Sequence, residues 1–276
     1  MMKMIKKFPV TSFFILNFLV SWTGLYFILG VDGMLGKKTI DGSLMPGLMT
    51  AMICGPLLSS VLLIIFLEGK QGFCLLKARL TKFKVSIKWY MFALVTAPFV
   101  TILTILILTP FSSKFFPLIL NSNDKVDLIL GGIIGGFVAG FFEELGWTGV
   151  ATPVLRGKYS ILITGLLIGI VWGLWHMPLF MAPDPEGTIP IAGLIVIRLL
   201  SHLVVFRIMI VWVYDKTQSL FIAIIMHMTL TACTLIFQPS ITSGVESMIY
   251  NITWTSIVAV IIMILNFSTE GEFTKR

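Results

Sequence analysis

The sequence predicts an all-α, polytopic membrane protein, a single bundle of about eight transmembrane helices over residues 1–276. Three observations indicate this. The chain is 57% hydrophobic, and its 12% of charged residues is about half of what soluble domains carry. It holds eight apolar stretches of about 20 residues or more, each long enough to cross a hydrocarbon core of ~30 Å. Its basic residues concentrate in alternate connecting segments, as they do in membrane proteins.

The first helix is predicted at about Phe8–Leu29, behind three lysines, and its apolar core is too long for a cleaved signal peptide. The other seven are expected at about Pro46–Leu67, Trp89–Pro110, Leu128–Ala151, Ser160–Ala182, Ile189–Tyr214, Gln218–Phe237 and Met248–Phe267. The connections between them leave no room for a separate soluble domain.

The basic residues predict an orientation. With a cytoplasmic N-terminus, the inner segments hold 14 lysines and arginines and the outer loops hold 4, while Arg198 and Arg207 lie inside the sixth stretch and complete the total of 20. This bias predicts a multi-pass protein of the cell membrane with both termini in the cytoplasm. It also explains the net charge of +7 without a nucleic-acid partner. The scattered Cys54, Cys74 and Cys233 fit neither a metal site nor a disulfide framework.

The largest polar connection, Glu68–Lys88, interleaves six basic residues with apolar ones. Two interpretations stay open. The segment is either a topology signal or an amphipathic stretch that lies on anionic lipids of the inner surface.

Several ionisable side chains lie inside the predicted helices, and all three histidines of the chain are among them. A charged group at the bilayer centre costs roughly 2.5–3.5 kcal/mol on insertion scales. We therefore expect Glu143, His176 and His227 to meet around one water-accessible cavity in the cytoplasmic half of the bundle. The alternatives are snorkelling carboxylates at the membrane edge and separate interhelical hydrogen bonds. The ionisable residues inside the predicted helices are Glu143, Glu144, His176, Arg198, His202, Arg207 and His227.

Small residues recur every four positions on two successive helices, and such ridges allow close helix approach. The glycines are Gly132, Gly136 and Gly140 on one helix, and Gly165, Gly169 and Gly173 on the next. We expect these two helices to pack together. Glu143 and His176 then lie near the shared interface, and Trp172, four residues before His176, walls it. Glu143 and Glu144 sit about 100° apart on a helix, so one faces the cavity while the other binds a neighbouring helix.

Other polar residues have candidate supporting roles. Arg198 and His202 share one helix face, and His202 is either a partner of Glu144 or a hydrogen-bonded residue beside a snorkelling arginine. Arg207 is expected to neutralise a lipid phosphate or Asp215. Thr148 follows the glutamates by four or five residues, so we expect it to hydrogen-bond one of them.

Three segments resemble the motifs of the CPBP family, intramembrane proteases related to CAAX prenyl endopeptidases and to bacteriocin-processing and immunity proteins. They are EELGWTG (Glu143–Gly149), WGLWHMP (Trp172–Pro178) and SLFIAIIMH (Ser219–His227), and the likeness covers about residues 128–235. Their order and approximate separation match the family. Two positions depart from it, because Thr148 stands where the family usually has arginine and Thr231 where it usually has asparagine or aspartate.

The resemblance implies hydrolysis of a peptide bond in a membrane-embedded or lipidated peptide or protein. Glu143 would take the proton of a water held by His176. His227 would stabilise the oxyanion, with Thr231 as a second donor. The family has also been described as metal-dependent, and Glu143, His176 and His227 could form a zinc site of catalytic type. The metal-free reaction is favoured because no HExxH-type spacing fixes two ligands on one helix.

Other function classes stay open. The same fold could serve a non-catalytic bacteriocin immunity protein or a peptide- or lipid-binding protein, which would tolerate the two departures. A transporter is less consistent with the sequence, because no internal repeat is found. The residues do not indicate whether a substrate is prenylated.

Overall fold

The computed structural model describes residues 2–38, 40–180, 202–239 and 244–276. Within them the regular structure is helical, apart from one isolated bridge between Pro117 and Pro239. The all-α prediction is confirmed. The longer helices are α2 (Pro9–Met34), α3 (Met45–Leu67), α4 (Gly69–Leu80), α5 (Ile87–Leu108), α6 (Lys125–Gly146), α8 (Ile161–Trp175), α11 (His202–Thr217), α12 (Leu220–Ile236) and α13 (Gly244–Ser268). The shorter ones are α1 (Met2–Lys7), α7 (Thr152–Arg156) and α9 (Met177–Phe180).

Five of the described helical segments are long and apolar enough to cross a membrane: Pro9–Met34, Gly42–Leu67, Ile87–Leu108, Lys125–Arg156 and Gly244–Ser268. Two more, α8 and α12, are apolar but shorter. The predicted sixth span begins outside the described residues and continues into them as α11. Each of the eight predicted stretches therefore contains a helix, and the chain is a polytopic membrane bundle. The number of helices that cross the membrane stays a prediction.

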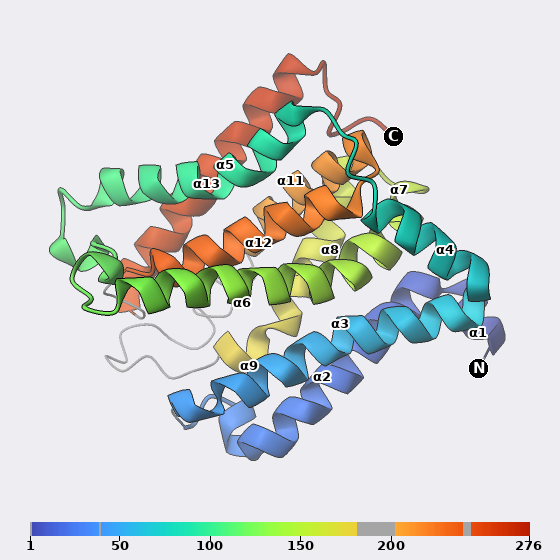
Figure 1. The fold of residues 1–276 in the computed structure, drawn as a ribbon, viewed down its shortest axis with the longest axis horizontal. Coiled ribbons are helices and arrows are strands. Elements are labelled where there is room, and N and C mark those ends of the chain that lie inside the picture. The colour runs from blue at the N-terminus through green and yellow to red at the C-terminus, as the bar shows by residue number, and fades with distance from the viewer. Residues whose placement is uncertain (1, 39, 181–201, 240–243) are drawn as a thin grey trace.

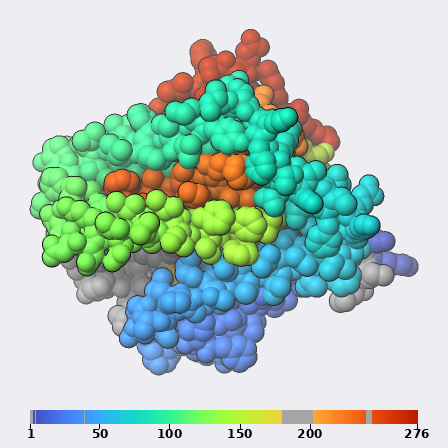
Figure 2. All heavy atoms as spheres, viewed as in Figure 1, coloured from blue at the N-terminus to red at the C-terminus, as the bar shows by residue number. Residues whose placement is uncertain are grey.

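The centre of the bundle is formed by α12, which packs along α6 on one side and α5 on the other (Figure 1). In the space-filling view, the orange atoms of α12 form a band between those of α5 and α6 (Figure 2). The pair α2 and α3 lies on the far side of α6, and α11 packs against α8. The site residues come from the ends and middles of α6, α8, α11 and α12.

The two glycine ridges do not face each other, so the predicted packing partner of each is wrong. A methyl group at Gly136 would lie 2.5 Å from the Met228 carbonyl oxygen of α12. One at Gly165 would lie 2.5 Å from the Ile208 Cα of α11, and one at Gly169 would lie 2.8 Å from the Val204 Cα. The ridges do serve close helix approach, but α6 approaches α12 and α8 approaches α11.

One end of the bundle gathers α4, α7 and both labelled chain ends (Figure 1). In α4 the apolar side chain of Leu76 packs against Gly149, and Arg79 donates to the Gly149 carbonyl (3.3 Å). Residues Gly69–Leu80 of the polar connection Glu68–Lys88 form α4. Whether this connection is a topology signal or also contacts anionic lipids stays a prediction. Ser160, predicted as the start of the fifth helix, caps α8 by accepting the Ile163 N–H. The cytoplasmic placement of the termini also stays a prediction.

Candidate active site

A fully buried ion pair lies at the centre of the site. Arg207 of α11 donates from Nη1 to Glu144 Oε2 (2.9 Å) and from Nη2 to Oε1 (2.8 Å), and neither side chain is exposed. This two-pronged geometry matches the planar guanidinium to the carboxylate. The prediction that Arg207 neutralises a lipid phosphate or Asp215 is wrong, because Asp215 pairs with Arg156 instead.

Glu144 accepts two further hydrogen bonds. His227 of α12 places Nδ1 2.7 Å from Oε1, and the Thr148 hydroxyl, one helical turn away on the same segment, donates to Oε2. The i, i+4 spacing predicted the contact with Thr148. Because an ionised carboxylate only accepts, it holds the proton of His227 on Nδ1 and turns Nε2 away from Glu144. With four donors around it, Glu144 serves as a structural anion.

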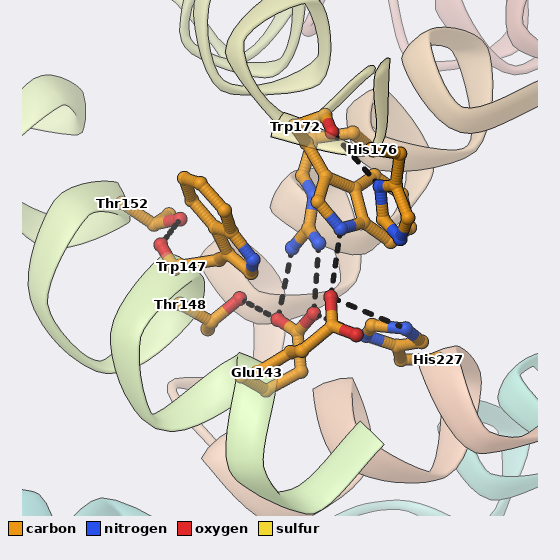
Figure 3. Close-up of polar contacts among 9 residues, drawn as sticks. Glu143, Trp147, Thr148, Thr152, Trp172, His176 and His227 are labelled. Carbon is orange, nitrogen blue, oxygen red and sulfur yellow. Dashed lines mark hydrogen bonds and ion pairs between the residues drawn. The ribbon is translucent and has the colours of Figure 1, made fainter. Parts of the chain in front are cut away.

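Glu143 lies beside this pair but has different partners. Its Oε2 accepts the indole N–H of Trp172 (2.7 Å) and lies 3.9 Å from His227 Nε2 (Figure 3). The latter distance is too long for a direct hydrogen bond. Glu143 is 4% exposed. The two adjacent glutamates thus point to different partners, as their angular separation predicts, and Glu143 is the one with unused acceptor capacity.

Trp172 connects the two histidines. Its ring contacts the His227 ring edge-on (centroids 5.0 Å apart) and the His176 ring (5.7 Å). His176 follows the last residue of α8, and its Nδ1 lies 2.9 Å from the Trp172 carbonyl oxygen. Trp22 of α2 fixes this helix end by donating to the Trp175 carbonyl (3.0 Å). The structure therefore places Glu143 and His227 next to each other without a direct hydrogen bond, and it places His176 beside them through its contacts with Trp172 (Figure 3).

The remaining predicted residues lie around this group. Thr231 is partly buried on α12, one turn beyond His227. His202 packs its ring against Trp254, with the ring centroids 5.4 Å apart. Arg207 pairs with Glu144, for which the sequence suggested His202 as a partner. Arg198 lies outside the described residues. Sequence reasoning assigned Arg207 elsewhere, although an arginine inside an apolar stretch was the available signal.

The fit to a metal ion can be tested on the donor set. No group of three or more His, Cys, Asp or Glu side chains in the described part of the chain is arranged to hold a metal ion. Only Glu143 and His227 of the three proposed zinc ligands approach each other closely, so we derive no step through a metal. What this arrangement offers chemically is a carboxylate and an imidazole nitrogen that face each other across a gap. Trp172 binds the same Glu143 oxygen that faces the ring, and Glu144 binds the opposite nitrogen of the ring.

Comparison with known proteins gives a consistent picture. Residues 125–233 match the family model described as Type II CAAX prenyl endopeptidase Rce1-like. A curated relative, "CAAX prenyl protease 2" of Methanococcus maripaludis, is 50% identical over 42 residues. That alignment covers 15% of this chain and 16% of the relative. The family-model match, residues 125–233, includes both glutamates, His176, Arg207 and His227. The resemblance to the CPBP and CAAX protease family is thereby confirmed over residues 125–233.

Proposed function

We propose that the protein is an intramembrane endopeptidase that hydrolyses a peptide bond of a membrane-embedded or lipidated peptide. The observation that carries this proposal is that the two adjacent glutamates have different partners. Glu144 is saturated by Arg207, His227 and Thr148, whereas Glu143 faces His227 Nε2 across 3.9 Å. If the glutamates served packing alone, the neutralised Glu144 would be enough. A second carboxylate, Glu143, would only add the cost of an ionisable group in hydrocarbon.

The proposed reaction requires a particular arrangement of protons among the four central groups. In the proposed mechanism both glutamates are ionised, and Arg207 together with a His227 that carries a proton on each ring nitrogen balances their charge. In this state Glu143 is a carboxylate that can accept a proton, and His227 offers Nε2–H as a donor. A buried group of zero net charge also avoids the penalty of an unpaired ion.

The reaction follows from these roles. Glu143 accepts a proton from water while the water oxygen attacks the scissile carbonyl carbon. The resulting oxyanion accepts the Nε2–H of His227, with the Thr231 hydroxyl as a candidate second donor. The C–N bond then breaks, and the leaving amine takes the proton from Glu143. His176, one turn from Trp172, is the candidate residue for holding the water.

The test is cleavage of a model peptide by purified protein in liposomes, with and without an isoprenyl group on the peptide. We expect cleavage by the wild type and its loss in Glu143→Gln. Asp127→Asn is the matched control, because Asp127 is an exposed carboxylate on the same helix. If the wild type binds the peptide without cleaving it, and Glu143→Gln binds equally, a non-catalytic binding function replaces the proposal.

Metal dependence is tested in the same assay. With Glu143 acting on water directly, a chelator should leave cleavage unchanged. Elemental analysis that finds about one zinc per chain, lost in His227→Ala, would contradict the metal-free mechanism.

A further inference from the structure

Arg207 is buried completely in the middle of an apolar bundle, where an arginine is expensive to place. The exposed fraction of its side chain is zero, and so is that of its partner Glu144. Such a pair adds little stability over apolar side chains of the same size. Its presence therefore calls for an explanation beyond packing.

The structure makes room for this arginine. Methyl groups at Gly165 and Gly169 of α8 would lie against the α11 backbone, and the one at Gly169 would also lie 3.3 Å from Arg207 Cβ. The glycines therefore let α11 approach α8 closely enough for the guanidinium to lie over the Trp172 ring, 4.3 Å from its centroid. An aromatic face stabilises a desolvated cation and fixes its plane.

From this position Arg207 acts on both glutamates. Its two terminal nitrogens fix Glu144, and Glu144 in turn holds His227 Nδ1 at 2.7 Å. Its stacking fixes Trp172, whose indole N–H is bound to Glu143. A carboxylate that orients a histidine selects which ring nitrogen is presented to the reaction.

We propose that Arg207 is the positioning residue of this site, which sets the ring orientation and protonation of His227 through Glu144 and the orientation of Glu143 through Trp172. This inference rests on the proposed function for its effect on cleavage. It extends that function, because it makes α11 a part of the site although α11 supplies no group to the reacting atoms.

The first experiment does not depend on activity. The chain has three histidines, so ¹⁵N-histidine labelling gives a spectrum simple enough to assign His227 by its loss in His227→Asn. We expect Nδ1 of His227 to be protonated in the wild type. In Arg207→Gln we expect mixed ring states. Arg156→Gln is the matched control, since Arg156 also pairs with a carboxylate, but that carboxylate is Asp215 and not one of the two glutamates.

The second experiment measures cleavage. We expect Arg207→Gln to lower kcat by roughly 10²–10⁴-fold, the range that a positioned proton-transfer group contributes. Arg207→Lys keeps the positive charge but lacks the planar guanidinium, so its kcat should lie between those of Arg207→Gln and the wild type. If the wild type does not cleave, the proposed function fails, while the histidine spectra still test Arg207.

A double variant separates positioning from packing. In Glu144→Met with Arg207→Met both charges are gone, and such replacements often preserve stability. We expect this variant to unfold at a temperature near that of the wild type and yet to remain without cleavage. If it cleaves like the wild type, or if Arg207→Gln leaves the His227 signals unchanged, Arg207 serves packing alone and the inference is overturned.

Discussion

Two arginine–carboxylate pairs in this chain have the same chemistry and different surroundings. Arg207 and Glu144 lie in the interior of the bundle with both side chains fully buried. Arg156 and Asp215 lie at the end of the bundle that holds the chain termini, with a Nε–Oδ1 distance of 2.7 Å and side-chain exposures of 16% and 26%. The interior pair makes two parallel hydrogen bonds, and the Arg156–Asp215 contact is made through one nitrogen.

The difference lies in what each pair holds in place. The interior pair continues into a network through His227 and Trp172 toward Glu143. The end pair joins the short helix α7 to the end of α11, and Arg156 also donates to the Tyr159 carbonyl nearby. Location therefore decides whether an ion pair organises a site or fastens two helix ends, and four measurements test this contrast.

Removal of one interior partner should have the largest effect. Glu144→Ala leaves Arg207 charged and buried without a counter-ion, so we expect the free energy of unfolding to fall by about 3–5 kcal/mol. Thermal or denaturant unfolding in detergent measures this. A loss below that of Asp215→Ala would show that the interior pair is no more important than the end pair.

The approach of α11 to α8 should be the next most sensitive feature. Gly165→Ala would place a methyl group 2.5 Å from the Ile208 backbone, and we expect overpacking to cost about 1–3 kcal/mol. Gly131→Ala is the control, because no atom lies within 4 Å of a methyl group there. It should be neutral or stabilising. Equal unfolding temperatures for the two variants would refute the close-approach role.

Thr148 should contribute less. Thr148→Val keeps the shape and removes the hydroxyl that donates to Glu144, so we expect a loss of about 1 kcal/mol. Thr148→Arg should be more harmful, since Arg207 already neutralises Glu144 and a second buried guanidinium would lack a partner. If Thr148→Arg proves as stable as the wild type, Glu144 has room for a second cation.

The end pair should show the smallest effect. Asp215→Asn at the partly exposed pair should cost at most about 1 kcal/mol. The difference from the wild type should shrink further in high salt, because exposed charges are screened. A salt-independent loss of several kcal/mol would show that this pair behaves like the interior one.

Hydropathy predicted the helices well, because the length of an apolar segment can be read from that segment alone, without knowledge of its neighbours. Helical spacing likewise predicted the contact between Thr148 and Glu144, which lie one turn apart. Partners across the bundle were less accessible. The glycine ridge of α6 signalled close approach correctly, but nothing local specifies α12 as the helix that approaches it.

The partner of Arg207 was out of reach for the same reason. Arg207 lies 63 residues from Glu144 in the sequence, and the pairing of the two depends on how α8 and α11 pack. The sequence did single out Glu143, His176 and His227, because ionisable groups in hydrocarbon are rare. It did not indicate that Trp172 would lie between the two histidines while binding Glu143.

The π-helical segment Trp147–Ala151 follows both glutamates directly. The Trp147 carbonyl accepts the Thr152 N–H five residues later and also the Thr152 hydroxyl (2.8 Å). A π turn contains one residue more than an α turn. Deletion of a single residue there would let the helix close in α register and turn the glutamates by about 100° relative to α7. We expect substitution of the partly exposed Val150 to leave the protein folded. We expect every one-residue deletion within Trp147–Ala151 to prevent folding.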